Sequence, residues 1–139
     1  MKKTILMLAM IFSLAALGYG QEKPQHRIDK ALDACIDKDS STAGMVECIG
    51  KAYTQWDAEL NKVYNELMKQ LDATGKASLK SAQLQWLKFR DSEFKLIDAV
   101  YSNLQGTMYI PMHADSRMQI IKNRAQELQS HLSILKEGR

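Results

Sequence analysis

The chain has 139 residues, of which 45% are hydrophobic and 25% are charged, with two cysteines, two prolines and a formal net charge of +3. This length suits one compact domain better than several. The small net charge argues against a nucleic-acid-binding protein, which normally carries a strongly basic stripe.

Residues 1–20 have the pattern of a secretory signal peptide. Two lysines precede the uncharged run TILMLAMIFSLAAL, and small residues follow at Gly18 and Gly20. The run is shorter than the roughly 20 residues that span a bilayer. We expect cleavage after Gly20, with Gly18 as second choice; a retained anchor is the alternative. Cleavage leaves residues 21–139 as one domain with 17 basic and 16 acidic residues, a net charge of +1.

The two cysteines, Cys35 and Cys48, predict one disulfide, because a secreted chain enters an oxidising compartment. A metal-binding pair is the alternative. The three histidines, His26, His113 and His131, are scattered and show no zinc-ligand spacing. We therefore expect neither a metal nor a cofactor.

Helical periodicity dominates the rest of the chain. There are few glycines and prolines and no convincing alternation of apolar and polar residues, which excludes an extensive sheet. Apolar residues recur at steps of three and four in four segments. They predict a short helix over about 24–38 and long helices over about 43–71, 76–104 and 115–136.

The connections between these segments carry turn and capping residues. Ser41 or Thr42 is placed to open the second helix. Gly75 and Gly106 are placed to end the second and third helices, and QGTMYIPMHA (105–114) is expected to be a loop. The predicted fold is all-α: a small antiparallel bundle of three long helices plus a short N-terminal helix, stapled by one disulfide.

Polar residues fall inside the apolar faces of two of these helices. Asp57, Asn61 and Tyr64 lie within about 60° of one another around the second helix. A turn near residue 74 would bring them level with the third helix. We interpret them as part of a structural polar core built on an Asp57–Arg90 ion pair, since a buried charge needs a partner. The full set is Asp57, Asn61, Tyr64, Gln83, Trp86 and Arg90. The alternative is an active site with Asp57 as general base.

Several spaced motifs resemble the LprI-type lysozyme inhibitor family. They are E-C at Glu47, D-x-x-L-N-x-x-Y from Asp57, L-K-x-x-Q-x-x-W-x-x-x-R-D from Leu79, and R-x-x-E-L from Arg124. The resemblance covers about residues 33–128. It implies a small secreted helical domain that inhibits lysozyme by binding and is not an enzyme.

The chain departs from the family pattern in its cysteines. The resemblance implies that members often carry a second cysteine pair, one partner of which follows the R-D motif by three residues. Phe94 occupies that position here, and no cysteine follows Cys48. We therefore expect the loop near Gly106 and the start of the last helix to be held more loosely than in four-cysteine relatives.

The expected function is a periplasmic or secreted inhibitor of lysozyme or a related peptidoglycan-cleaving enzyme. The candidate partner-binding loop comprises Thr107, Met108, Tyr109, Ile110, Met112 and His113, because exposed aromatic and methionine side chains commonly anchor interfaces. The same side chains could instead fold back as a lid over the bundle end. The alternative function is an envelope interaction or immunity-type module with a partner other than lysozyme.

Overall fold

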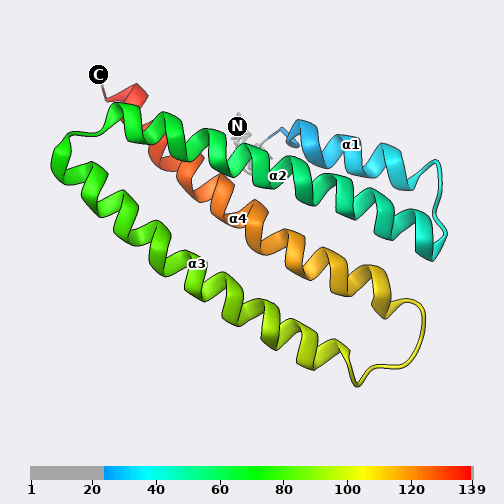
Figure 1. Ribbon diagram of the computed structural model, residues 1–139. Helices are drawn as coiled ribbons and strands as arrows, with labels where there is room; N and C mark the ends of the chain where they lie inside the picture. The colour runs from blue at the N-terminus through cyan, green and yellow to red at the C-terminus, as the bar shows by residue number, and fades with distance from the viewer. Residues whose placement is uncertain (1–23, 139) are drawn as a thin grey trace, which may run out of the picture.

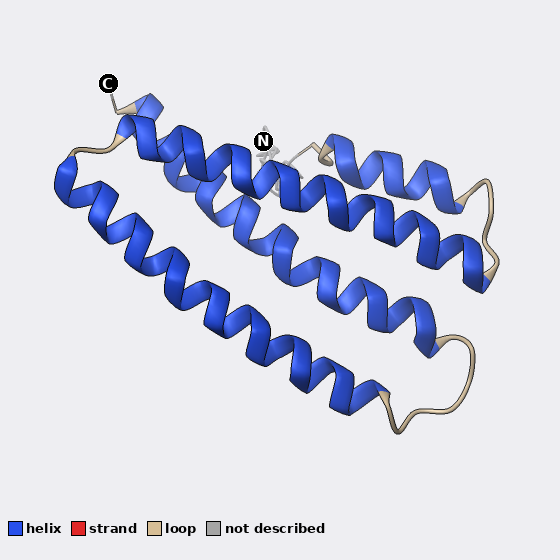
Figure 2. Cartoon of the chain, viewed as in Figure 1, coloured by secondary structure: helices blue, strands red, loops and turns tan. Residues whose placement is uncertain are grey.

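The computed structural model describes residues 24–138, in which all regular secondary structure is helical. The helices are α1 (Arg27–Ile36), α2 (Thr42–Gln70), α3 (Ala73–Tyr101) and α4 (Tyr109–Glu137) (Figures 1 and 2). The predicted bundle of one short and three long helices is confirmed, and consecutive long helices run in opposite directions (Figure 1). The expected signal peptide, residues 1–20, lies outside the described residues.

A disulfide joins α1 to α2, as predicted. Cys35 and Cys48 are bonded, with their Cα atoms 5.7 Å apart. A 2.8 Å ion pair between Arg27 and Glu59 also connects the two helices. Burial alone would raise the pKa of Glu59, but Lys62 and Arg27 outweigh this effect and lower it. Covalent and ionic contacts therefore fix α1 to α2.

Side-chain caps begin both α2 and α3. Ser41 Oγ accepts from the backbone N–H of Gly44 over 3.0 Å, which confirms the predicted cap of α2. Asp72 Oδ1 accepts from the N–H of Gly75 over 2.7 Å. The prediction that Gly75 ends the second helix is wrong, because α2 ends at Gln70 and Gly75 lies in the first turn of α3. An N-cap aspartate satisfies a free N–H of the first turn, so DATG starts a helix.

The long helices do not pack in chain order. α4 lies between α2 and α3, and α1 lies on the other side of α2 (Figure 1). The closest pair, α2 and α4, run in the same direction, whereas α3 contacts mainly α4 (Figure 1). Two antiparallel connections between the three long helices bring the first and third back into parallel alignment. The sequence-based assumption that α2 packs along α3 is therefore wrong.

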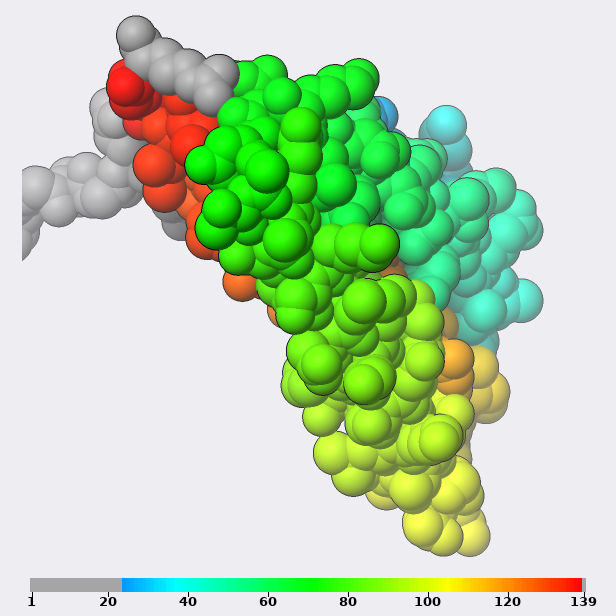
Figure 3. Space-filling view, turned by 60° about the vertical axis from the view of Figure 1, so that its left-hand side comes forward, coloured from blue at the N-terminus to red at the C-terminus, as the bar shows by residue number. Residues whose placement is uncertain are grey.

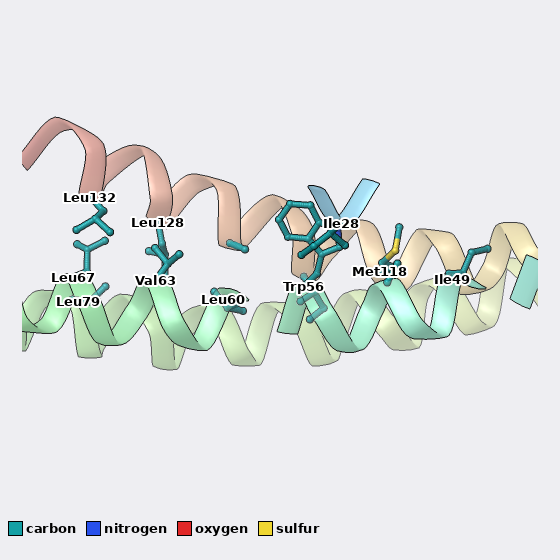
Figure 4. Close-up of a cluster of buried hydrophobic side chains, with 13 residues drawn as sticks. Ile28, Ile49, Trp56, Leu60, Val63, Leu67, Leu79, Met118, Leu128 and Leu132 are labelled. Carbon is teal, nitrogen blue, oxygen red and sulfur yellow. The ribbon is translucent and has the colours of Figure 1, made fainter. Parts of the chain in front are cut away.

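The hydrophobic core lies mainly between α1, α2 and α4. Figure 4 shows Leu67 of α2 and Leu132 of α4 pointing toward one another. The largest fully buried side chains are Ile28, Trp56, Val63, Met118, Ile121, Leu128 and Leu132. Among the described residues, α3 contributes only Leu79 to the buried set.

Helix α3 is therefore amphipathic but thinly packed. Phe89 and Val100 of α3, and Leu104 just beyond its end, are large apolar side chains, yet they are 52%, 52% and 43% exposed. Buried residues follow one another along most of α2 and from Met118 to Leu132 of α4, whereas no such run occurs on α3. The faces of α2 and α4 therefore form most of the core, and α3 occupies the edge of the bundle.

Candidate protein-binding site at the corner between α3 and α4

The Asp57–Arg90 ion pair predicted from the sequence is wrong. Arg90 Nη2 lies 2.6 Å from Oδ1 of the adjacent Asp91, and Asn61 Nδ2 donates over 2.9 Å to the backbone oxygen of Asp57. Among the described residues, no ion pair joins α2 to α3. In the structure α4 occupies the position beside α2 that the prediction gave to α3.

The other members of the predicted polar core have separate surroundings. Tyr64 and Trp86 are partly buried and pack against the hydrophobic core. Arg90 lies 5.7 Å from the centre of the Trp86 ring. Gln83 faces α4, where its Oε1 accepts from Arg124 Nε over 3.1 Å. The structure therefore does not bring the six residues together as one cluster.

Arg124 is the buried cation that the sequence analysis did not assign to the core. It is 8% exposed, and its Nη1 donates to Glu127 over 2.8 Å. A signal for it was present, because Arg124 follows Ile121 by three residues and precedes Leu128 by four, within the apolar seam of α4.

Polar contacts hold the carboxyl-terminal half of α3 against α4. Asp98 Oδ1 lies 2.8 Å from both Arg117 Nη1 and His113 Nε2. The hydroxyl groups of Tyr101 and Ser116 lie 3.0 Å apart. The His113 hydrogen bond, and then the Arg117 charge, hold the pKa of Asp98 below its ordinary value. These contacts replace the apolar packing that α3 lacks.

The chain turns from α3 into α4 earlier than predicted. The connection is residues 102–108, and residues 109–114 of the predicted loop belong to the start of α4. Pro111 lies in the first turn of α4, where a missing N–H breaks no helical hydrogen bond. Gly106, with a φ of +116°, lies within the connection instead of directly ending α3. Gly106 therefore correctly marks a turn between the two helices, but the turn ends at residue 108 and not at residue 114.

Residues 104–113, from the later part of the connection into the start of α4, form a projecting tip that we call the corner (Figure 3). Met108, Ile110 and Met112 are 61%, 52% and 45% exposed. Thr107 is also exposed, whereas Tyr109 and His113 are partly buried. Pro111 anchors the tip by its burial, so the two methionines and the isoleucine do not fold back over the bundle end.

A hollow of about 360 Å³ lies beside the exposed side chains. Its apolar and aromatic walls include Tyr101, Leu104, Tyr109 and Ile110, and the Asp98–His113 pair forms a polar edge. A small concave surface beside exposed methionines is suited to receiving side chains of a protein partner. The corner therefore has the shape and exposed apolar side chains of a protein-binding surface.

Residues 24–138 contain no cluster of three or more histidine, cysteine or acidic side chains arranged to hold a metal ion. Within the same residues, no helix is both long enough and apolar enough to cross a membrane.

Comparisons with known proteins agree with the motifs. Residues 35–128 match the family described as lysozyme inhibitor LprI. A crystal structure of an uncharacterized protein from Burkholderia thailandensis is 33% identical and superposes with a TM-score of 0.77, over 83% of this chain. The match spans 58% of that longer chain. No curated protein matches. Because the family match covers most of the sequence, including the disulfide and the long helices, this chain belongs to the LprI lysozyme inhibitor family.

Proposed function

We propose that this protein inhibits lysozyme, or a related peptidoglycan-cleaving enzyme, by binding it through the corner. The family match carries the proposal, because the family is described as one of lysozyme inhibitors. The described residues also offer the kind of surface that binding requires: exposed Met108, Ile110 and Met112 beside a concave hollow. The protein acts as a ligand of the enzyme and needs no catalytic group of its own.

The proposed site of action is outside the cytoplasm. The Cys35–Cys48 disulfide supports an oxidising compartment, where such bonds persist. The signal-peptide pattern of residues 1–20 supports export to the periplasm or beyond. Lysozyme substrates lie in that compartment, so inhibitor and target would meet there.

Short-range contacts would dominate the interaction. After signal cleavage the net charge is only +1, which gives little long-range attraction to a strongly basic lysozyme. Apolar anchors in a well-packed contact contribute most of the binding energy in many interfaces. Inhibition should therefore depend on the corner side chains and only weakly on salt concentration.

The direct test is to titrate muramidase activity of several lysozymes with the purified mature protein. Replacing Ile110 and Met112 together by Asp should weaken inhibition by at least about tenfold, because it places charges in an apolar contact. Ile134→Asp is the matched control, since Ile134 is also on α4 and is 63% exposed but lies far from the corner. Full muramidase activity at micromolar mature protein would reject the proposal. Capture of a different envelope protein would then favour an immunity-type module.

A further inference from the structure

A second concave surface lies at the opposite end of α3 from the corner. It is an open groove of about 480 Å³ where α2, α3 and α4 meet. Its apolar lining includes Leu67 and Leu71 from α2, Leu79 from α3, and Leu128 and Leu135 from α4. This volume is within the range of about 300 to 1,000 Å³ that is usual for small-molecule sites.

Small residues on α3 create the groove. Gly75, Ser78 and Ala82 line it and follow one another at steps of three and four, so they share one face of the helix. A larger side chain at Ser78 or Ala82 would occupy part of this groove. The small side chains of α3 therefore leave the groove open. Leu79, which also lines it, is the only buried residue of α3 among the described residues.

One wall of the groove contains a buried cation with unused hydrogen-bonding capacity. Arg124 donates from Nε to Gln83 and from Nη1 to Glu127. Its Nη2 is buried and has no hydrogen-bond partner among the described residues. A guanidinium group has five N–H donors, and leaving buried donors unsatisfied is unfavourable. The described residues supply no acceptor for this nitrogen, and the guanidinium carbon lies 5.9 Å from the centre of the Trp86 ring.

We propose that the groove binds a long-chain carboxylic acid, with the acyl chain against the leucines and the carboxylate at Arg124. The planar guanidinium matches a carboxylate in geometry and charge. The partner of Nη1, Glu127, is 55% exposed, so water screens most of its repulsion of a second carboxylate. The site is separate from the corner, and the inference does not depend on lysozyme inhibition.

Calorimetric titration with dodecanoate, kept below its critical micelle concentration, tests this site. Dodecanoate should bind saturably, and dodecanol should bind at least about tenfold more weakly, because it lacks the charge that Arg124 recognises. Arg124→Gln should weaken dodecanoate binding by a similar factor and remove the preference for the acid. Lys136→Gln removes an exposed charge from the same helix and should leave binding within about twofold of the wild type.

A second pair of variants keeps the test decisive even if Arg124→Gln does not fold. Ala82→Leu places a large side chain in the groove and should abolish saturable binding, whereas Ala99→Leu, at an exposed position near the other end of α3, should not. Equal affinity for dodecanoate and dodecanol, or unchanged dodecanoate binding by folded Ala82→Leu, would overturn the proposal. Lysozyme inhibition by Ala82→Leu should be unaffected, which separates this proposal from the proposed function.

Discussion

Arg117 of α4 holds Asp98 of α3 by a 2.8 Å hydrogen bond, and its guanidinium also lies 4.3 Å from the centre of the Phe94 ring. Because α3 has little apolar packing, we predict that Arg117→Ala frees the carboxyl-terminal half of α3 locally. Hydrogen exchange of residues 94–101 should accelerate, while global stability falls by no more than about 1 to 2 kcal/mol. Arg27→Ala, which breaks the ion pair between α1 and α2, is the control and should leave α3 exchange unchanged.

The same contact should depend on pH. The pKa of Asp98 is lowered in the folded protein by the hydrogen bond with His113 and by Arg117. Its stabilising effect is therefore fully present above the ordinary aspartate pKa of 3.8 and is lost as pH falls through the lower folded value. The melting temperatures of wild type and Asp98→Asn should differ most near pH 6, and the difference should shrink as the pH falls below 3.8. A difference that stays constant as the pH falls below 3.8 would contradict this assignment.

Two aromatic residues of opposite burial should respond very differently to truncation. Trp56 is 1% exposed in the centre of the core, whereas Phe89 of α3 is 52% exposed. We predict that Trp56→Ala destabilises the protein by about 3 to 5 kcal/mol and that Phe89→Ala costs less than about 1 kcal/mol. Urea denaturation of both variants measures the difference. Comparable losses would mean that α3 is packed more tightly than its exposure indicates.

Asp57→Ala should be nearly neutral, because the predicted ion pair with Arg90 does not form. In the structure the Asp57 side chain contacts Asn61 at 3.4 Å, one helical turn away. Losing such a contact costs about 0.5 kcal/mol or less. Thermal denaturation checks this, and a loss above 2 kcal/mol would show that Asp57 has a buried partner after all.

Removing the disulfide should destabilise the protein substantially. Cys35 and Cys48 are separated by 13 positions, and a loop of that size contributes about 3 kcal/mol in the chain-entropy account. The Cys35→Ser, Cys48→Ser double variant should lose about that much in urea denaturation. Dithiothreitol should lower the stability of the wild type similarly and have no effect on the double variant. A dithiothreitol effect on the cysteine-free protein would show that reduction is not the cause.

Local signals in the sequence predicted the helices well. The Ser41 cap, the disulfide and the long periodic stripe of α2 all depend on residues near one another in the chain. The same local information misplaced the boundary at Gly75, because an N-cap aspartate two residues after α2 competes with glycine as the dominant signal.

The choice of neighbouring helices could not be read from spacing alone. Asp57 and Arg90 both fall on the apolar faces of their helices, but which helices pack together depends on contacts between residues far apart in the chain. In the structure α4 packs against α2, and Arg124 is the buried cation. The corner was predicted as an exposed surface, and its three large apolar side chains are exposed, but partner binding stays a prediction.

The disulfide between α1 and α2 can form long before the four helices have packed together. Cys48 precedes every residue of α3 and α4 in the chain, and the sequence holds only two cysteines, so no wrong pairing within the chain competes. By contrast, Leu67 and Leu132 meet only after nearly the whole chain has been made (Figure 4). In an oxidising compartment the disulfide can therefore fix the first helical hairpin before the remaining helices pack onto it.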